Sequence, residues 1–212
     1  LYASQLMARV VGEIKKISSQ NMTVLVLGES GVGKELVARA IHKLSKGNTH
    51  PFVPVNCGAL PEELFESELF GHERGAFTGA VKTKPGLLEF ANSGTFFFDE
   101  IGDMSLPMQI KMLRLLEEKK IRRVGGNREI DIDVRIIAAT NKNLAKQIGN
   151  GNFREDLYYR LNTFQIMVPP LRDRKDDIVL LAEHLLSELC RKGGLPQKSF
   201  SKGALEALKE YT

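Results

Sequence analysis

One short segment of the sequence combines glycines with a lysine at a spacing that suits phosphate binding. Residues 28–35 have the sequence GESGVGKE and stand between a short apolar run and a helical pattern, which is the setting of a P-loop. Glycines let backbone N–H groups wrap a phosphate, and Lys34 can reach the β and γ phosphates of a nucleoside triphosphate. A glycine-rich turn that merely opens a helix is the alternative, and this setting disfavours it. We expect nucleotide binding by Gly28, Glu29, Ser30, Gly31, Val32, Gly33, Lys34 and Glu35.

Two carboxylates end another apolar run and offer the oxygens that a metal ion needs. Glu35 stands where a P-loop usually has the Ser or Thr that holds magnesium, so the ion must depend on other oxygens. The apolar run 96–98 leads directly into Asp99 and Glu100. Asp99 is placed to bind Mg²⁺, often through water, and Glu100 to orient and deprotonate an attacking water. Alone, the pair would suggest a solvated turn, but a P-loop upstream favours the catalytic interpretation.

A polar amide follows a third apolar run. Residues 135–141 have the sequence RIIAATN, which places Asn141 at the carboxyl edge of the predicted sheet, where open α/β folds bind ligands. Asn141 is therefore a candidate sensor of the γ-phosphate or of the attacking water. The alternative is a helix N-cap, a common role for asparagine.

Five short apolar runs must position these residues. Such runs are typical of strands buried on both faces of a parallel sheet. Helical patterns alternate with them, which predicts an α/β fold with helices on both faces of the sheet. The expected strands are 23–27, 52–55, 95–98, 134–139 and 164–168, and the expected helices are 4–18, 33–45, 61–70, 105–118 and 154–161.

After Pro170 the strand-like runs stop. Residues 176–190 and 201–211 are helical in pattern. We therefore expect two domains, an α/β core over residues 1–170 and a partial helical lid over residues 171–212.

Composition places loose limits on function. The chain has 212 residues, of which 42% are hydrophobic, and a formal net charge of +4, so it can bury one sizeable core and its charge does not demand a nucleic-acid partner. Because the sequence has no apolar run of membrane-spanning length and no signal-peptide pattern, we expect a cytoplasmic protein without a membrane partner. Cys57 and Cys190 lie outside any metal-binding pattern and are expected to be buried free thiols.

Several longer segments, taken together, resemble a known family. They resemble the sigma-54 interaction domain, the central AAA+ domain of the bacterial sigma-54 (enhancer-binding) transcription activators, and the similarity runs over essentially the whole chain. Glutamate at the position of Glu35 is usual in that family, and GAFTGA is nearly diagnostic of it. The segments are VNCGALPEELFESELFGHERGAFTGA at 55–80, SGTFFFDEIGDM at 93–104, RIIAATN at 135–141 and FREDLYYRL at 153–161.

The resemblance implies a fold and an activity. It implies an AAA+ P-loop NTPase with a five-stranded parallel sheet of order 5-1-4-3-2. It further implies rings, commonly hexamers, that hydrolyse ATP with Mg²⁺ between subunits. The energy remodels RNA polymerase holoenzyme containing sigma-54, which activates transcription, and this part of such a protein meets promoter DNA only indirectly.

The resemblance also implies residue roles. Asn56 would restrain the Glu100 carboxylate until the nucleotide state changes. Arg154 and Arg160 would reach the γ-phosphate of the neighbouring subunit. For both arginines, ordinary surface salt bridges are the alternative. Phe77 would be an exposed tip on a flexible loop, or else an anchor packed on its own domain. The expected contact with sigma-54 comprises Gly75, Ala76, Phe77, Thr78, Gly79 and Ala80.

Two more segments have expected places in this family. Residues 124–133, with paired glycines between β-type residues, predict a hairpin, which the resemblance puts near the ring pore; a solvated turn is the alternative. In the family a lid arginine follows the position of Thr212, so we expect a truncated lid and slower hydrolysis than in a version extended by one helix.

Two other functions remain open. Another AAA+ motor, of the clamp-loader or unfoldase type, would share the phosphate site but not GAFTGA. A non-hydrolysing, nucleotide-dependent scaffold would leave Glu100 and the arginines idle.

Overall fold

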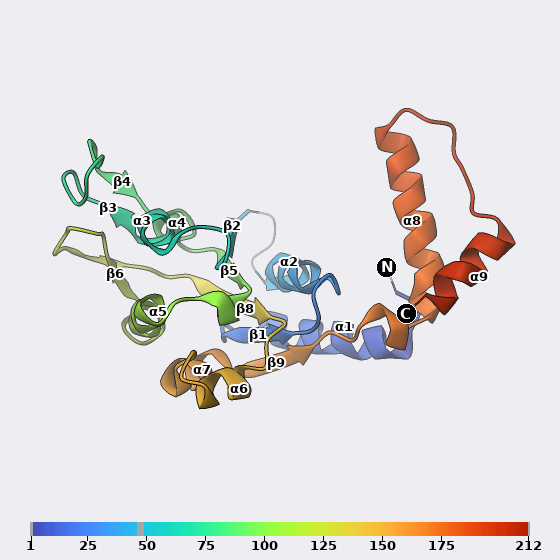
Figure 1. The fold of residues 1–212 in the computed structure, drawn as a ribbon, viewed down its shortest axis with the longest axis horizontal. Coiled ribbons are helices and arrows are strands. Elements are labelled where there is room, and N and C mark those ends of the chain that lie inside the picture. Colours follow the sequence, from blue (N-terminus) through green and yellow to red (C-terminus); the bar gives the residue numbers. More distant parts are fainter. Residues whose placement is uncertain (1, 46–48, 212) are drawn as a thin grey trace.

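The computed structural model describes residues 2–45 and 49–211. Its centre is a five-stranded sheet of order β2-β5-β8-β1-β9, in which every neighbouring pair is parallel (Figure 1). Numbered along the chain, this is the expected order 5-1-4-3-2, and each strand end lies within about one residue of its expected position. The strands are β1 (Val24–Leu27), β2 (Phe52–Asn56), β5 (Thr95–Asp99), β8 (Arg135–Thr140) and β9 (Phe164–Met167).

Helices cover both faces of the sheet, because successive strand residues point to opposite sides. Phe97 packs with residues of α1 (Gln5–Ser18) and α2 (Lys34–Ser45). Phe96 and Phe98 pack on the other side, against residues of α3 (Glu62–Phe70), α5 (Leu106–Glu118) and α7 (Glu155–Leu161). Strands that are apolar on both faces therefore form the middle layer, as their uninterrupted apolar runs predict.

Two small hairpins extend from this core. Strand β3 (Gly71–His72) pairs with β4 (Lys84–Pro85), and β6 (Lys120–Arg122) pairs with β7 (Glu129–Asp131), both antiparallel. Only the second strand of the β6–β7 hairpin lies within the range predicted, 124–133, because the first strand ends at Arg122, before that range begins. The short helices α4 (Leu87–Phe90), α6 (Leu144–Gly149), η1 (Ile101–Asp103) and η2 (Leu171–Asp173) complete the core.

Two helices follow the last strand of the sheet. They are α8 (Asp176–Lys192) and α9 (Lys202–Glu210), close to the expected positions, and they lie at the end of the molecule opposite the hairpins (Figure 1). The domain boundary near Pro170 stays a prediction. Cys57 and Cys190 are free and buried, as expected.

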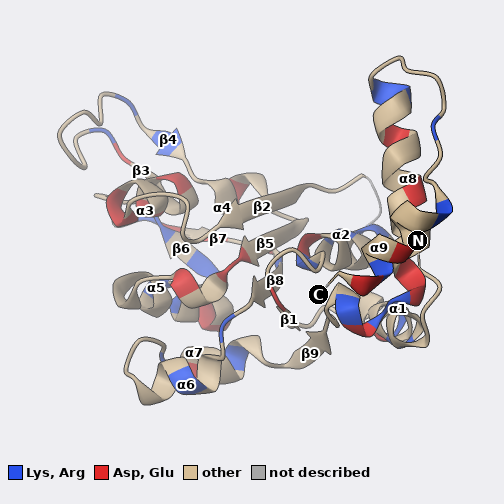
Figure 2. Cartoon of the chain, turned by 45° about the vertical axis from the view of Figure 1, so that its right-hand side comes forward, with Lys and Arg blue, Asp and Glu red and all other residues tan. Residues whose placement is uncertain are grey.

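Residues of both charge signs occur on many of the described elements (Figure 2). Acidic and basic residues alternate on helices at both sides of the sheet (Figure 2). Within residues 2–45 and 49–211, no helix is both long and apolar enough to cross a membrane.

Candidate nucleotide site and loop surface

The P-loop connects β1 to α2 in a conformation that needs glycine. Gly33 has φ +98°, a region that side chains with a Cβ atom rarely adopt. A Cβ atom on Gly28 would lie 2.9 Å from the carbonyl oxygen of Val168, so the loop runs close to the end of β9. A cavity of about 360 Å³ lies beside the loop, and Ser30, Lys34, Asp99 and Glu100 are among its lining residues.

Lys34 is the first residue of α2, and its side chain is buried. Its Nζ donates hydrogen bonds to the carbonyl oxygens of Gly28 (3.1 Å) and Glu29 (3.2 Å). The same ammonium forms an ion pair with Oε1 of Glu100 at 3.0 Å. A buried cation needs such partners, and here they include the loop and the predicted catalytic carboxylate.

Glu100 is held from two sides in an unusual backbone conformation. Its φ of +50° is in the left-handed region, which costs a residue other than glycine on the order of 1 kcal/mol and recurs at functional sites. Its Oε2 accepts a hydrogen bond from the Asn141 backbone N–H (3.0 Å), while its own N–H donates to Oδ1 of Asp99 (3.1 Å). The structure thus brings together Lys34, Asp99, Glu100 and Asn141, as the sequence predicts, although Asn141 makes this contact through its backbone.

Asp99 lies at the end of β5 in a site that disfavours its charge. Partial burial, followed by the charge of Glu100, raises the pKa of the Asp99 carboxyl, although Lys34 opposes the shift. The carboxylate of Glu35 pairs with Arg39 at 2.6 Å, and both residues also line the cavity beside the P-loop. The described residues include no cluster of three or more potential protein ligands for a metal. The carboxylate of Asp99 is a suitable ligand for Mg²⁺, which commonly takes one or two carboxylates and completes its shell with phosphate and water oxygens.

Replacing Asp99 by asparagine should stabilise the nucleotide-free protein. Because the folded-state pKa of Asp99 is raised, its ionised form costs stability at neutral pH, and this cost shrinks as the pH falls through the raised pKa. We expect Asp99→Asn to raise Tm at pH 7, with a smaller gain near pH 4. This difference in Tm is measured by thermal unfolding of the two proteins without Mg²⁺ or nucleotide.

Asp103→Asn is the matched control for that experiment. Asp103 is also an acid close to β5, but its carboxylate pairs with Lys142 at 2.5 Å, so its loss should leave Tm unchanged or slightly lower. A Tm for Asp99→Asn below that of Asp103→Asn would contradict the argument.

Asn56 ends β2 directly opposite Asp99 in the parallel register. Its side-chain oxygen accepts a hydrogen bond from the Gly58 backbone N–H at 2.9 Å. In the part of the chain that the structure describes, the Glu100 carboxylate is bonded by Lys34 and Asn141, and no hydrogen bond joins it to Asn56. The structure places Asn56 beside the site, and its control of Glu100 stays a proposal.

Arg154 and Arg160 bind carboxylates close to α7 of their own chain. Arg154 forms two hydrogen bonds with Asp156, at 3.1 and 2.6 Å. Arg160 pairs with Glu117 at 3.0 Å, and its side chain is 61% exposed. Since exposed ion pairs contribute little free energy, both guanidinium groups can exchange these partners at small cost.

The GAFTGA loop joins β3 to β4. A hydrogen bond from the Gly75 N–H to the Ala80 carbonyl oxygen (2.8 Å) closes it. Phe77 is 43% exposed at the tip, and its ring meets the ring of His72 edge-on at 5.1 Å. Both sequence interpretations are therefore partly right, because the aromatic tip faces solvent and also has one contact on its own domain.

A second loop, between β6 and β7, is fastened to the GAFTGA loop. Val124 exchanges backbone hydrogen bonds with Gly71 (2.9 Å) and Glu73 (3.0 Å). Arg123 pairs with Glu89 at 2.7 Å and with Glu73 at 3.1 Å. The hydrogen bond to Glu89, followed by that to Glu73, raises the pKa of Arg123, although burial opposes the shift. The two loops lie at the same end of the molecule (Figure 1). The sequence analysis did not predict the pairing of Arg123 with Glu73 and Glu89, since no periodic or motif signal marks these residues.

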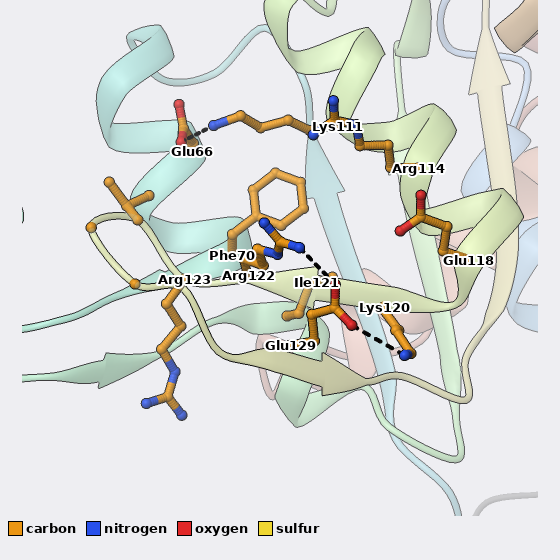
Figure 3. Close-up of a pocket in the computed structure, with 13 residues that line it drawn as sticks. Glu66, Phe70, Lys111, Arg114, Glu118, Lys120, Ile121, Arg122, Arg123 and Glu129 are labelled. Atoms are coloured by element: carbon orange, nitrogen blue, oxygen red, sulfur yellow. Dashed lines mark hydrogen bonds and ion pairs between the residues drawn. The ribbon is translucent and has the colours of Figure 1, made fainter.

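A larger cavity, of about 730 Å³, lies away from the P-loop, between α3, α5 and the β6–β7 hairpin (Figure 3). It is rich in cations, but Lys111 pairs with Glu66, and Lys120 and Arg122 both pair with Glu129. These pairs neutralise three of the cations that line it, whereas the cavity beside the P-loop is lined by Lys34, Asp99 and Glu100.

Comparison with known proteins agrees with this geometry. The family model described as "Sigma-54 interaction domain" matches residues 1–167. The chain belongs to this family. A second model, "AAA+ ATPase lid domain", matches residues 172–212, so this sigma-54 interaction domain is followed by the expected helical lid.

Relatives at high identity are transcriptional regulators by name. The chain is 51% identical over 205 residues to the "Transcriptional regulatory protein GlrR" of Escherichia coli (strain K12), covering 97% of this chain and 46% of that protein. It is 52% identical over 199 residues to the "Response regulator protein PilR" of Pseudomonas aeruginosa, covering 94% and 45%. The chain thus spans just under half the length of these relatives.

A solved structure confirms the fold. NtrX from Brucella abortus in complex with ADP superimposes with a TM-score of 0.93 at 36% identity, covering 100% of this chain and 46% of that one. The same protein in complex with ATP gives a TM-score of 0.91. The AAA+ fold expected from the sequence is therefore confirmed.

Proposed function

We propose that this domain hydrolyses ATP with Mg²⁺ and uses the energy to remodel sigma-54 RNA polymerase holoenzyme, which activates transcription. The observation that carries the proposal is the ion pair between the P-loop lysine and the carboxylate at the end of β5, Lys34–Glu100 at 3.0 Å. It puts a phosphate-binding cation and a candidate base within one site of a sigma-54 interaction domain. The ADP and ATP complexes of the similar protein NtrX support nucleotide binding.

The Lys34–Glu100 pair suggests how nucleotide binding prepares the base. A triphosphate in the P-loop offers Lys34 stronger anionic partners than Glu100 and the two carbonyl oxygens. Glu100 then loses its cation but keeps the hydrogen bond from the Asn141 N–H. It is then free to orient a water molecule and take its proton. Asn141, beside the same carboxylate, is suited to sense the γ-phosphate.

Asp99 is the residue that would hold Mg²⁺, directly or through water. When bound, the ion would neutralise charge that develops on the phosphate oxygens. Asn56, at the end of the neighbouring strand, would compete for Glu100 when the nucleotide state changes.

The remaining groups act between subunits. We propose a ring, commonly six subunits in this family, in which Arg154 and Arg160 leave Asp156 and Glu117 to bind the γ-phosphate of the neighbour's nucleotide. Residues Gly75 to Ala80 contact sigma-54 through Phe77 and Thr78. Because the β6–β7 loop is fastened to the GAFTGA loop, the two loops are expected to move together.

Phe77→Ala tests the partner contact. A buried aromatic anchor is typically worth 2 kcal/mol or more, so we expect sigma-54 binding to weaken about thirtyfold, with basal ATPase unchanged. The complex is measured with ADP and aluminium fluoride, and hydrolysis by phosphate release. Thr78→Ala should act in the same direction. Lys82→Ala, an exposed change beside the loop, is the control and should bind normally.

Each rival function gives a different result in these assays. Undiminished complexes with both loop variants would move the sigma-54 contact elsewhere. ATP binding without phosphate release at any protein concentration would indicate the scaffold. Hydrolysis by a wild-type protein that forms no complex with sigma-54 would indicate another AAA+ motor.

A further inference from the structure

An arginine at the start of the helical lid binds the backbone of the P-loop. Arg174 follows η2, its side chain is buried (9% exposed), and its Nη2 donates a hydrogen bond to the Val32 carbonyl oxygen at 2.9 Å. The peptide that joins Val32 to Gly33 is trans, so its C=O and N–H groups point in opposite directions within one plane. By holding the Val32 oxygen, Arg174 fixes the direction of the Gly33 N–H, one of the loop's donors to phosphate.

A buried carboxylate connects Arg174 to the beginning of α1. Asp177, in the first turn of α8, is fully buried, and its N–H donates to the Arg174 carbonyl oxygen at 2.9 Å. Its Oδ1 accepts hydrogen bonds from the backbone N–H groups of Ala3 (2.5 Å) and Ser4 (2.7 Å), and its Oδ2 accepts one from Ser4 Oγ (2.8 Å). Burial alone raises the pKa of this carboxyl, but these hydrogen bonds and the charge of Arg174 hold it below its usual value.

Ser4 has a double role at this junction. Its hydroxyl donates to Asp177 and also accepts a hydrogen bond from the Met7 N–H at 3.3 Å, which caps α1. The position of residues 3 and 4 is therefore coupled to α1 and to the first turn of α8. A series of hydrogen bonds therefore runs from Ser4 to the Asp177 carboxylate, from the Asp177 backbone N–H to the Arg174 carbonyl oxygen, and from the Arg174 guanidinium to the Val32 carbonyl oxygen. Removing one member of such a network destabilises the protein by more than the free energy of a single hydrogen bond, because the remaining partners stay buried and unpaired.

We propose that Asp177 and Arg174 are positioning residues through which the segment at residues 3–4 controls the P-loop, so that displacing this segment weakens nucleotide binding. The proposal rests on the proposed function, since it assumes that the loop binds nucleotide. A neighbouring contact from η2, the exposed pair of Arg172 with Glu29 (2.7 Å), reaches the loop through a side chain. It does not fix a peptide plane, and exposed pairs contribute little.

The test measures the Kd of a fluorescent ADP analogue for the whole chain. Asp177→Asn, Arg174→Gln and Ser4→Ala should each weaken binding about fivefold or more, as expected for loss of one buried charged hydrogen bond. Ser4→Thr, which keeps the hydroxyl, should restore wild-type affinity. Asp176→Asn is the matched control: this acid lies in the same turn of α8 but is exposed, and its loss should change nothing.

A double-mutant cycle separates positioning from general loss of structure. In the Arg174→Gln background, Ser4→Ala should have no further effect on Kd, because the hydrogen bond from Arg174 to the Val32 carbonyl oxygen, through which Ser4 acts on the loop, is already lost. Hydrogen exchange at the Gly33 amide should rise in each single variant while the thermal transition stays cooperative. Additive effects of Ser4→Ala and Arg174→Gln, or wild-type Kd values in both, would overturn the proposal. The cycle decides the matter even if Asp177→Asn fails to fold.

Lys34→Ala in the same assay distinguishes this proposal from the one on which it rests. If the wild-type chain does not bind the analogue, or Lys34→Ala binds it equally well, nucleotide binding by the P-loop is wrong. If Lys34→Ala fails to bind while Ser4→Ala and Arg174→Gln bind like wild type, the positioning role alone is wrong.

Discussion

Glu100→Gln should bind ATP at least as tightly as the wild type and hydrolyse it about 10²- to 10⁴-fold more slowly, the range found when a general base is removed. Glutamine keeps an oxygen that can accept the Asn141 N–H, but it loses the charge that pairs with Lys34 at 3.0 Å. Lys34 is then freer to bind phosphates, and no carboxylate remains to take a proton from water. Nucleotide affinity and single-turnover hydrolysis, measured separately, show the two effects.

Lys34→Ala should weaken ATP binding itself, in contrast to Glu100→Gln, which should weaken only hydrolysis. Its ammonium is the buried cation of the P-loop, and loss of a charged partner for the phosphates should weaken ATP binding about tenfold to a hundredfold or more. Lys43→Ala is the control, because this exposed lysine of the same helix, α2, is not among the residues that line the cavity beside the P-loop. Equal loss of affinity in Glu100→Gln and Lys34→Ala would contradict the division of roles.

The groups that the sequence located correctly share one property: each follows a strand of the parallel sheet. Parallel strands place their carboxyl ends at one edge, so residues after β1, β5 and β8 must meet there whatever the details of the side chains. Lys34, Glu100 and Asn141 meet for this reason. The topology therefore made the nucleotide site predictable from three separate segments.

Contacts between distant, non-periodic positions were not predictable in this way. Asp177 and Ser4 lie 173 positions apart, and Arg123 and Glu89 lie 34 apart, with no motif to mark either pair. Their partners depend on how loops and helix ends pack, which hydrophobic periodicity does not describe. The four-residue helix α4 was missed because it is too short to show a period.

Asn56 illustrates a different limit. The resemblance related it to Glu100, and the structure places it at the end of β2, opposite the neighbouring residue Asp99. An asparagine side chain can also bond its own backbone two residues on, and here it bonds Gly58. A residue's position thus followed from strand order, whereas its hydrogen-bond partner depended on local competition.

Arg160→Ala should lower ATP turnover about 10³-fold or more, the range measured for arginine fingers, and leave ATP binding unchanged. Within its own chain Arg160 pairs with Glu117, and its side chain is 61% exposed, so its loss should affect a neighbouring subunit's site and not its own P-loop. Arg191→Ala, which removes another exposed arginine, is the control and should retain wild-type turnover. Wild-type activity per subunit should rise with protein concentration until rings are complete.

Mixing two inactive variants tests whether the site is shared. A subunit carrying Arg160→Ala still offers Lys34, and one carrying Lys34→Ala still offers Arg160, so an interface that combines them has both groups. In a closed ring with head-to-tail interfaces, an equal mixture should restore about a quarter of wild-type activity, because one interface in about four pairs the two intact groups in the required order. If Arg160 acted within its own chain, each subunit would lack one essential group and mixing would restore nothing.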